Sequence, residues 1–497
     1  METVVLGQGV INAKFVSGPR RAERIVQKAL SYMVKGAEHT ELFKSKRWDG
    51  RSSFYSGTNK QFPAGFVGLV SAQLRKHKYS VSVKRAEAPE PQGPERPLID
   101  AFGYDDARYA YQPGISDTFA RHKRMICQVA TGGGKSRIAR IVTARVNRPT
   151  LFLTTRKVLM YQMKGHYEDM QRSLGRKRRI GVIGDSEWDP VNGINVGMVQ
   201  TLASMLLSDK PAKRKKAKEF LRKVELVILE EAHEASGDSF YNVMNVMRNA
   251  HYRLALTATP FMKDDQEANM RLMAVTGAIG ARVTEKQLID SGILAEPFFK
   301  IIDPGASKGL YRGTAWQRAY NLGIVESAGR NAKICAEAER ASLYDISVLV
   351  LVQRKKHGAL LAKQLRERGM TAEFIWGDSK GKERTKTLKQ LGNGEIDVLI
   401  GSTILDVGVD VPSIGMIILA GGGKAEVGLR QRVGRGLRAK ATGPNKAFIV
   451  DFNDRHNEIL WRHSQQRQGI LDATPGFAER VLSTSQDFDF TGFQRVR

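Results

Sequence analysis

Short apolar runs separated by helix-length stretches dominate the pattern of hydrophobic and polar positions from residue 98 onward. One series comprises MICQVA, TLFLTT, INVGMVQT, ELVILEE and RLALTAT, and a second comprises SVLVLVQ, AEFIWGD, DVLIGST, GMIILAGG and KAFIVDF. Runs that are apolar throughout, often β-branched and bounded by Gly, Thr or Asp, are typical of strands buried on both faces of a parallel sheet. Strand alternating with helix in two series predicts two α/β domains, at residues 98–295 and 296–460.

A different composition precedes these domains. The segment AEAPEPQGPERP, residues 86–97, is rich in proline and charge and has no hydrophobic period, which favours a linker. We expect residues 1–90 to form a small α+β domain and residues 461–497 to form a C-terminal tail. A chain of 497 residues is too long for one hydrophobic core, in agreement with several domains.

The charge balance indicates the class of partner. The chain has 79 Lys and Arg against 51 Asp and Glu, a formal net charge of +28. An excess of this size favours a polyanion such as nucleic acid, although a solvated basic surface would give the same balance. The run KPAKRKKAKEF, residues 210–220, predicts a basic helix that is either such a solvated face or a phosphate contact.

Other classes of protein fit the sequence poorly. An apolar run near 18 residues and a signal peptide are both missing from the sequence, so we expect no membrane partner and a cytoplasmic protein. Cys127 and Cys335 are the two cysteines, which excludes a disulfide scaffold and a cysteine-rich metal site.

A glycine-rich turn follows the first strand in CQVATGGGKSRIAR. Glycines allow the backbone N–H groups to face a phosphate chain, a lysine at the helix start reaches the β- and γ-phosphates, and a hydroxyl beside it holds Mg²⁺. Val129 stands where such loops usually have a leading glycine. A chance turn is the alternative, but the strand–turn–helix context favours a phosphate-binding loop. The predicted contacts are Thr131, Gly132, Gly133, Gly134, Lys135 and Ser136.

An acidic pair ends a second strand, in VILEEAHEAS. In enzymes with a phosphate-binding loop, an acidic side chain at the end of a neighbouring strand holds Mg²⁺ and another carboxylate prepares the attacking water. Glu230 and Glu231 occupy such a strand end. Two exposed glutamates after a strand are common, but His233 and the upstream loop favour a role in catalysis.

The order and spacing of these segments resemble the superfamily 2 helicases and translocases. TLFLTTRKVLMYQ, GMVQTL and LTATP are similar to motifs Ia, Ib and III, and IGSTILDVGVDVP and QRVGRGLR are similar to motifs V and VI. Gln112, in YAYQPGISDTF, is similar to the adenine-recognising glutamine of the Q motif. The resemblance spans residues 109–440, and the ordered series is far more specific than any one motif.

This resemblance implies two tandem RecA-like parallel-sheet domains that bind ATP in the cleft between them. Gly408 and Asp410 fall among the nucleotide contacts of motif V. Two arginines of motif VI fall at the arginine-finger positions, which stabilise charge that develops on the γ-phosphate. The implied catalytic residues are Lys135, Glu231, Arg435 and Arg438.

The acidic pair departs from the usual Asp-Glu-Ala-His motif of the family. Counting back from His233, Glu231 falls on the water-activating glutamate and Glu230 on the aspartate that holds Mg²⁺. Glu230 keeps the charge and adds one methylene, and a carboxylate that acts on Mg²⁺ through a bound water tolerates such a change in reach. We therefore expect a working ATPase that uses ATP and Mg²⁺, with Ser136 and Glu230 as the metal residues.

The N-terminal stretch KRWDGRSSFYSGTNKQFPAGFVGLVSAQLRKHKYSV carries a narrower resemblance, to the phage UvsW-type helicases. It implies fork reversal, Holliday junction migration and R-loop unwinding on branched or partly single-stranded DNA. We expect a monomer, in the host cytoplasm if the chain is phage-encoded. Three alternatives stay open: an RNA helicase, the motor of a restriction system, and an annealing or scaffold protein with a decayed ATPase.

Overall fold

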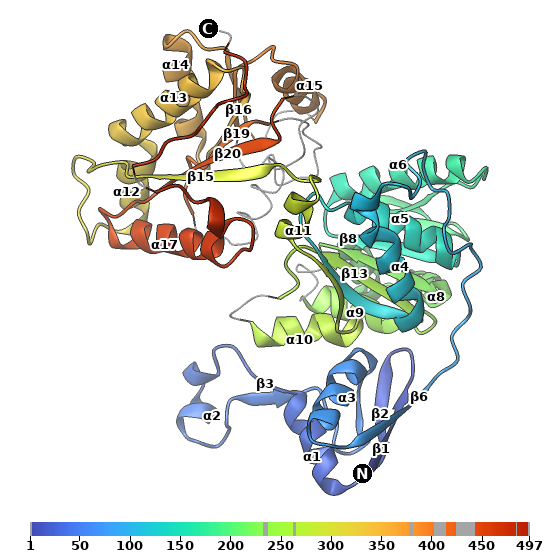
Figure 1. The fold of residues 1–497 in the computed structure, drawn as a ribbon. Helices are drawn as coiled ribbons and strands as arrows, with labels where there is room; N and C mark the ends of the chain where they lie inside the picture. Colours follow the sequence, from blue (N-terminus) through green and yellow to red (C-terminus); the bar gives the residue numbers. More distant parts are fainter. Residues whose placement is uncertain are drawn as a thin grey trace. The chain divides into compact units, whose positions relative to one another are not determined.

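The chain divides into two compact units, each of which is described by itself. The first unit comprises Met1–Val129 and Gly134–Val283, and the second comprises Ala130–Gly133 and Thr284–Arg497. Figure 1 shows the fold of the computed structural model. The structure describes residues 2–231, 237–261, 265–376, 381–401, 414–423, 443–483 and 485–495.

An eight-stranded sheet forms the centre of the first unit. Its strand order is β10-β9-β11-β8-β12-β13-β7-β14, and all neighbours run parallel except the β9–β10 pair. The central strands are fully buried, as expected for apolar runs covered on both faces. The strands are β7 Arg124–Val129, β8 Thr150–Thr154, β9 Gly181–Gly184, β10 Glu187–Asp189, β11 Ile194–Met198, β12 Leu226–Glu230, β13 Tyr252–Thr257 and β14 Ile279–Val283.

Helices cover both faces of this sheet (Figure 1). Helices α4, α5 and α6 contact one another in series, and α7 to α10 share a buried apolar cluster with strands β8 and β12. The helices are α4 Tyr111–His122, α5 Lys135–Val146, α6 Lys157–Ser173, α7 Val199–Leu207, α8 Pro211–Lys223, α9 Asp238–Val246 and α10 Gln266–Val275. The basic run at 210–220 is helical, as predicted.

The N-terminal residues form a small α+β fold within the first unit. A mixed sheet of order β5-β2-β1-β6 packs against α1 and α3, and a separate β3–β4 pair is joined through α2. Its core includes Met270 and Ala274 of α10. A side chain at Gly65 would lie 1.9 Å from the carbonyl oxygen of Met273, so the two parts meet at backbone distance. The elements are β1 Thr3–Gln8, β2 Asn12–Ser17, α1 Arg20–Ala29, β3 Ser31–Met33, α2 Glu41–Lys44, β4 Arg51–Ser53, β5 Gln61–Pro63, α3 Val67–Lys76 and β6 Ser80–Arg85.

The proline-rich segment after β6 contains no helix or strand, but the rest of the first unit holds it in place. The backbone N–H of Gly93 donates to the carbonyl of Arg145 at 2.9 Å, and the hydroxyl of Tyr252 donates to the carbonyl of Pro89 at 2.7 Å. A Cβ atom at Gly93 would lie 2.0 Å from the carbonyl oxygen of Ala144. This segment is therefore a bonded strap on the surface of the first unit.

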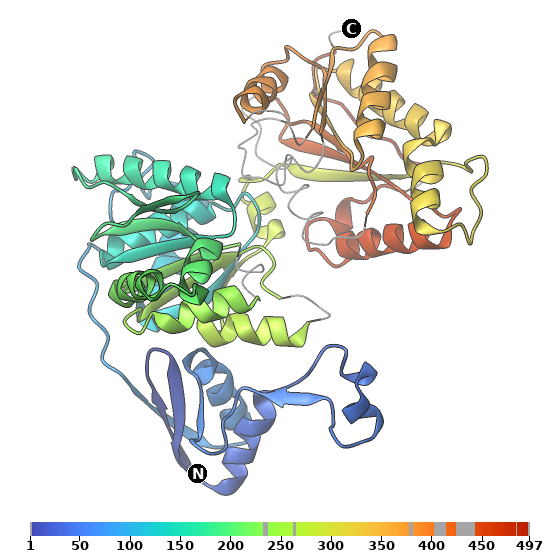
Figure 2. The ribbon, with the colours of Figure 1, turned by 180° about the vertical axis from the view of Figure 1, so that it is seen from behind.

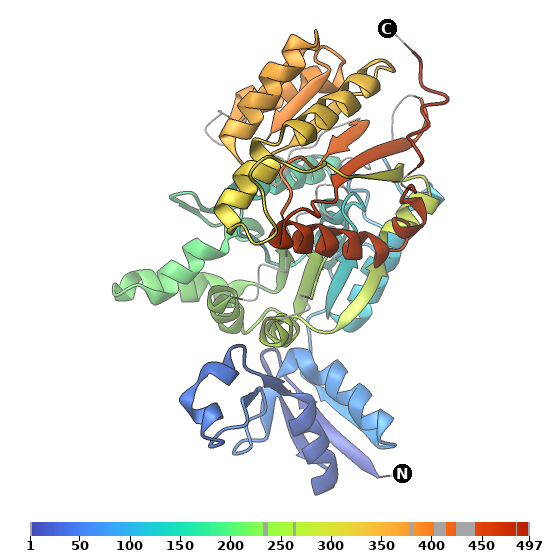
Figure 3. The same ribbon diagram turned by 90° about the vertical axis from the view of Figure 1, so that its left-hand side faces the viewer.

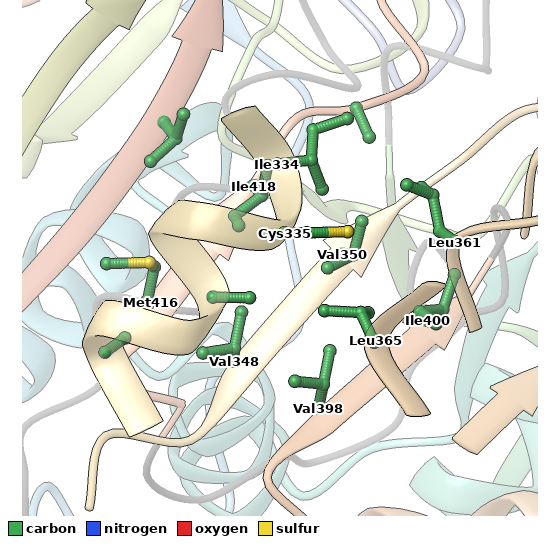
Figure 4. Close-up of a cluster of buried hydrophobic side chains, with 14 of the residues drawn as sticks. Ile334, Cys335, Val348, Val350, Leu361, Leu365, Val398, Ile400, Met416 and Ile418 are labelled. Atoms are coloured by element: carbon green, nitrogen blue, oxygen red, sulfur yellow. The ribbon is translucent and has the colours of Figure 1, made fainter. Parts of the chain in front are cut away.

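A six-stranded, fully parallel sheet of order β15-β20-β19-β16-β18-β17 forms the second unit (Figure 2). Figure 4 shows the apolar core between this sheet and α13 and α14, with Cys335 and Val350 inside it. Phe488 and Phe490 join the same core. The elements are α11 Glu285–Asp290, β15 Glu296–Ile302, α12 Trp316–Tyr320, α13 Ala328–Ser342, β16 Val348–Leu351, α14 Lys355–Glu367, β17 Ala372–Ile375, α15 Gly381–Gly392, β18 Val398–Gly401, β19 Met416–Ile418, β20 Lys446–Phe452 and α17 Glu458–Asp472.

Two buried arginines fix the loop that follows β19. Arg330, 0% exposed, pairs with Asp454 and donates to the carbonyl of Ala420 at 3.1 and 3.2 Å. Arg467 donates to the carbonyl of Gly423 at 2.7 Å and lies 3.8 Å from Asp454. These buried ion pairs lie beneath the loop. Breaking one of them would leave a charge without a partner in a nonpolar environment, at a high cost in free energy.

The structure confirms the predicted fold class: two domains built on parallel sheets, preceded by a small α+β segment. Within the residues that the structure describes, no helix has both the length and the apolar character needed to cross a membrane.

Candidate active site

Three adjacent strands end at one edge of the first sheet and carry the predicted catalytic residues. In the order β12-β13-β7, the strands run parallel, so their carboxyl ends share this edge. The glycine-rich loop follows β7, Glu230 ends β12, and Thr257 ends β13. The amide of Gln128 donates to the carbonyl of Ala258 at 3.3 Å, which ties the last two of these ends together. Ligands of open α/β sheets bind at such an edge.

The loop has the backbone expected of a phosphate cradle. Gly132 and Gly134 have φ of 88° and 77°, in the left-handed region that glycine adopts without strain. The N–H of Gly133 donates to the carbonyl of Ala130 at 3.0 Å, which closes a tight turn. Helix α5 begins at Lys135 with no acidic residue in its first turn, so its free N–H groups and positive dipole end favour an anion.

Gln112 lies directly against this loop. It is 1% exposed, and a Cβ atom at Gly134 would lie 2.4 Å from its Nε2 atom. Arg137, one residue into the helix beyond Ser136, donates to its Oε1 at 2.7 Å. Arg137 also pairs with Asp100 at 3.0 Å. The predicted base-recognition glutamine and the phosphate loop are therefore held in one bonded cluster.

Arg137 has no counterpart among the residues predicted from the sequence. Its guanidinium stacks on Phe102 and Tyr104, with 5.0 and 5.4 Å to the ring centres. Phe102 is 48% exposed, so one ring beside Gln112 remains open to a flat ligand. The signal in the sequence is an arginine just after the Gly-Lys-Ser turn together with the aromatic, acidic stretch LIDAFGYDDARYAY.

Gly134→Ala is expected to weaken nucleotide binding, because the new methyl group displaces the Gln112 amide from the loop. The matched control is Gly175→Ala. Gly175 has a similar φ of 67° but open space around its Cβ position, so it carries the same backbone strain, about 1 kcal/mol, without touching the site. Titration with a fluorescent ATP analogue measures both affinities. Equal affinities in the two variants would contradict the contact.

Glu230 is buried at 5% exposure, and its Oε2 atom has no hydrogen-bond partner among the described residues. Burial raises the pKa of Glu230 to about 7, the charge of Lys135 lowers this pKa, and Glu231 raises it. Lys135 and Glu231 thus both act electrostatically on this carboxyl. Glu231 itself has φ of 51°, a left-handed conformation that costs a non-glycine residue about 1–3 kcal/mol. Strain of this kind concentrates at functional positions.

Mg²⁺ fits this set of groups. A buried carboxylate oxygen without a donor is a hard ligand for a cation, and the Ser136 hydroxyl lies on the first turn of α5. Mg²⁺ usually retains several waters and takes one or two protein groups together with substrate phosphates. The described residues contain no group of three His, Cys, Asp or Glu side chains that could hold a metal by themselves.

The segments similar to motifs Ia, Ib and III lie at the same carboxyl-terminal edge. The amide of Gln200 donates to the carbonyl of Thr155 at 3.1 Å, which joins the first turn of α7, directly after β11, to the loop after β8. In the third segment, the N–H of Thr259 donates to the hydroxyl of Thr257 at 3.2 Å. Thr257 is thus a strand-end cap.

Four of the predicted site residues lie outside the described residues: Gly408, Asp410, Arg435 and Arg438. His233, which set the register of the acidic pair, also lies outside them. Their roles stay predictions. The structure describes the other predicted site residues: Gln112 lies on α4, Thr131 to Gly134 connect β7 to α5, Lys135 and Ser136 begin α5, Glu230 ends β12 and Glu231 follows it.

Two family models match the chain. Residues 102–262 match "Type III restriction enzyme, res subunit", and residues 332–440 match "Helicase conserved C-terminal domain". The first match spans the glycine-rich loop and the acidic pair, and the second spans the segments similar to motifs V and VI.

One named relative matches most of the chain. The chain is 21% identical over 436 residues to "ATP-dependent DNA helicase uvsW" of Enterobacteria phage T4. The aligned region covers 82% of each chain. It is 25% identical over 270 residues to "Putative helicase 22" of a Sulfolobus islandicus filamentous virus, spanning 52% of this chain and about half, 47%, of that protein. Among solved structures, "DUF1998 helicase MrfA bound to DNA" has a similar fold, with a TM-score of 0.56 at 13% identity over 77% of this chain and 52% of that one.

Proposed function

From the premise that this chain belongs to the superfamily 2 helicases and is an ATP-dependent helicase, we propose that it moves branch points in DNA. The specific reactions are fork reversal, Holliday junction migration and R-loop unwinding. The observation that carries the proposal is the match to the phage DNA helicase over 82% of both chains. A match over 82% of this chain is longer than the two domains expected at residues 98–460, so it is not confined to them.

The described residues support ATP hydrolysis as follows. The backbone N–H groups of Gly132–Gly134 and the ammonium of Lys135 bind the phosphates, and Gln112 recognises the base. Glu231 orients the attacking water and takes its proton. Ser136 and Glu230 would hold Mg²⁺, which when bound neutralises charge on the phosphates. Arg435 and Arg438 are proposed to complete the site.

DNA is the proposed partner because the phage relative is named a DNA helicase and because this chain carries a large positive charge. The net charge of +28 favours binding through phosphates, with little dependence on base sequence and a steep dependence on salt. The β3–β4 pair and α2 carry a basic, partly exposed segment around Trp48, whose indole donates to the carbonyl of Arg51 at 2.7 Å. We propose that this segment contacts the branch, and that the protein acts as a monomer in the host cytoplasm.

The test is ATP hydrolysis by the full chain with four nucleic acids of equal nucleotide concentration: single-stranded DNA, linear duplex, a four-way junction and RNA. We expect the junction to stimulate hydrolysis most and to be converted to two duplexes in a gel assay. Equal stimulation by linear duplex and junction would contradict the branch specificity.

The same assay separates the alternatives. Stimulation by RNA above every DNA would favour an RNA helicase, and strand annealing without hydrolysis would favour a scaffold with a decayed ATPase. The match to a restriction-enzyme subunit over residues 102–262 supports a second candidate, the motor of a restriction system. Cleavage of the DNA in the gel lanes would favour that candidate.

A further inference from the structure

Two adjoining hollows lie where strands β8 and β11 begin, at Thr150 and Ile194. Their volumes are about 570 Å³ and about 500 Å³, and Pro149, Val191 and Asn192 line both. The strands are parallel, so this is the amino-terminal edge of the sheet, opposite the edge that carries the candidate active site. We call the two hollows together the back-edge groove.

The larger hollow is strongly cationic. Arg179 is already paired with Asp189, and Arg148 lies 3.7 Å from Glu225. Arg178 is exposed and has no ion-pair partner within the described part of the chain. The sequence signal is the run RKRR at residues 176–179, which the motifs did not include. The arginines that line this hollow are Arg148, Arg176, Arg178 and Arg179.

Helix α8 supplies the cations of the smaller hollow. Lys216 and Lys223 line it, with Glu219 as its acidic lining residue. The ammonium of Lys216 lies 5.1 Å from the ring centre of Trp188, and Phe220 meets that ring edge to face at 5.9 Å. The helix stands out from the body of the first unit (Figure 3). The basic helix predicted from the sequence thus borders a shaped hollow and is more than a solvated face.

A buried polar group also faces the groove. Gln171 lines the larger hollow, is 4% exposed, and its Oε1 atom has no hydrogen-bond partner among the described residues. Buried polar atoms without partners are rare in proteins, and a bound group can satisfy them. A sugar hydroxyl or a base amine can donate to this oxygen while phosphates lie against the arginines. The groove therefore has donors and an acceptor suited to a nucleotide chain.

We propose that the back-edge groove binds the phosphate backbone of a second nucleic-acid segment, a duplex arm of the branched substrate. The inference rests on the proposed function, because a junction has several duplex arms and one of them can bind away from the edge that carries the candidate active site. Phosphates lying on Arg178, Lys216 and Lys223 release counterions, which provides affinity without base specificity. A groove on the opposite edge keeps the bound arm apart from the candidate active site.

The test uses a triple variant of the full chain, Arg178→Glu, Lys216→Glu and Lys223→Glu. All three side chains are exposed, so the fold should survive, as the thermal midpoint will show. Affinity for a four-way junction at physiological salt should fall by about tenfold or more, and the slope of log K against log salt should decrease by about 3. Hydrolysis stimulated by single-stranded DNA should match the parent.

The control reverses the same number of charges elsewhere, with Lys308→Glu, Lys363→Glu and Lys389→Glu in the second unit, all exposed. The proposal would be overturned if the two triple variants lost junction affinity equally, or if the groove variant kept the junction affinity of the parent.

A second measurement separates this inference from the proposed function. The parent is saturated with single-stranded DNA, and the binding of a labelled 12-base-pair duplex is then followed by anisotropy. The parent should still bind the duplex and the groove variant should not. If the parent binds the duplex in this way but does not prefer junctions, the result supports the groove as a binding site and contradicts the proposed branched substrate. If the saturated parent binds no duplex, the groove is wrong.

Discussion

Glu231→Gln is expected to lower the rate of ATP turnover by about 10²–10⁴-fold, the usual contribution of a group that orients and deprotonates water. The change preserves the size of the side chain and removes its negative charge and its basicity. ATP affinity should remain at the parent value, because the glycine-rich loop, Lys135 and Gln112 are intact. Phosphate release in the presence of single-stranded DNA measures the turnover, and an ATP-analogue titration measures the affinity.

The neighbouring substitution Glu230→Asp supplies the matched control. Aspartate keeps a carboxylate at the end of β12 and shortens the arm to the length usual in the family, so we expect most of the turnover to remain and the ratio of Mg²⁺- to Mn²⁺-supported rates to change. The two glutamates are adjacent and chemically alike, and only their roles separate them. An inactive Glu230→Asp beside an active Glu231→Gln would mean that the register of the acidic pair is shifted by one residue.

Lys135→Ala should abolish nucleic-acid-stimulated ATP hydrolysis while the fold survives. The ammonium at the start of α5 acts as a point charge on the transferred phosphate, and no other described cation occupies the first turn before Arg137. Lys164→Ala, on α6 away from the loop, is the control for the loss of one positive charge. Steady-state hydrolysis and the thermal midpoint should be measured for both. Hydrolysis at the parent rate in Lys135→Ala would remove the assignment of the phosphate loop.

Much of the architecture follows from local hydrophobic pattern. All ten apolar runs are strands, because continuous Val, Ile and Leu segments have no stable place except inside a doubly covered sheet. In the two parallel-sheet domains, the four strands that the pattern did not indicate are short, partly exposed or at a sheet edge: β9 and β10 are four and three residues long, and β14 and β15 are half-buried. Their pairing depends on neighbours far away in the sequence, which a local pattern does not contain.

The candidate site divides in a similar way. Gln112, Lys135, Glu230 and Glu231 could be found because their chemistry fixes both residue type and spacing along the chain. Arg137 could not be found in this way, because its role depends on Asp100 and the aromatic residues near it. These residues come close to Arg137 only when the segment before α4 folds over α5. The back-edge groove could not be predicted from the sequence for the same reason, because its cationic side chains come from separate elements.

The bonded strap after β6 has a consequence for how the protein unfolds. Exposed proline-rich segments between domains are usually the first sites of proteolytic cleavage. Here the strap is hydrogen-bonded along its length, and the core beneath the N-terminal sheet includes Met270 and Ala274. The N-terminal residues and the ATPase domain should therefore melt in one cooperative transition and resist nicking between them. A destabilising change near Gly65 would then lower the amount of active enzyme in a cell without touching any catalytic group.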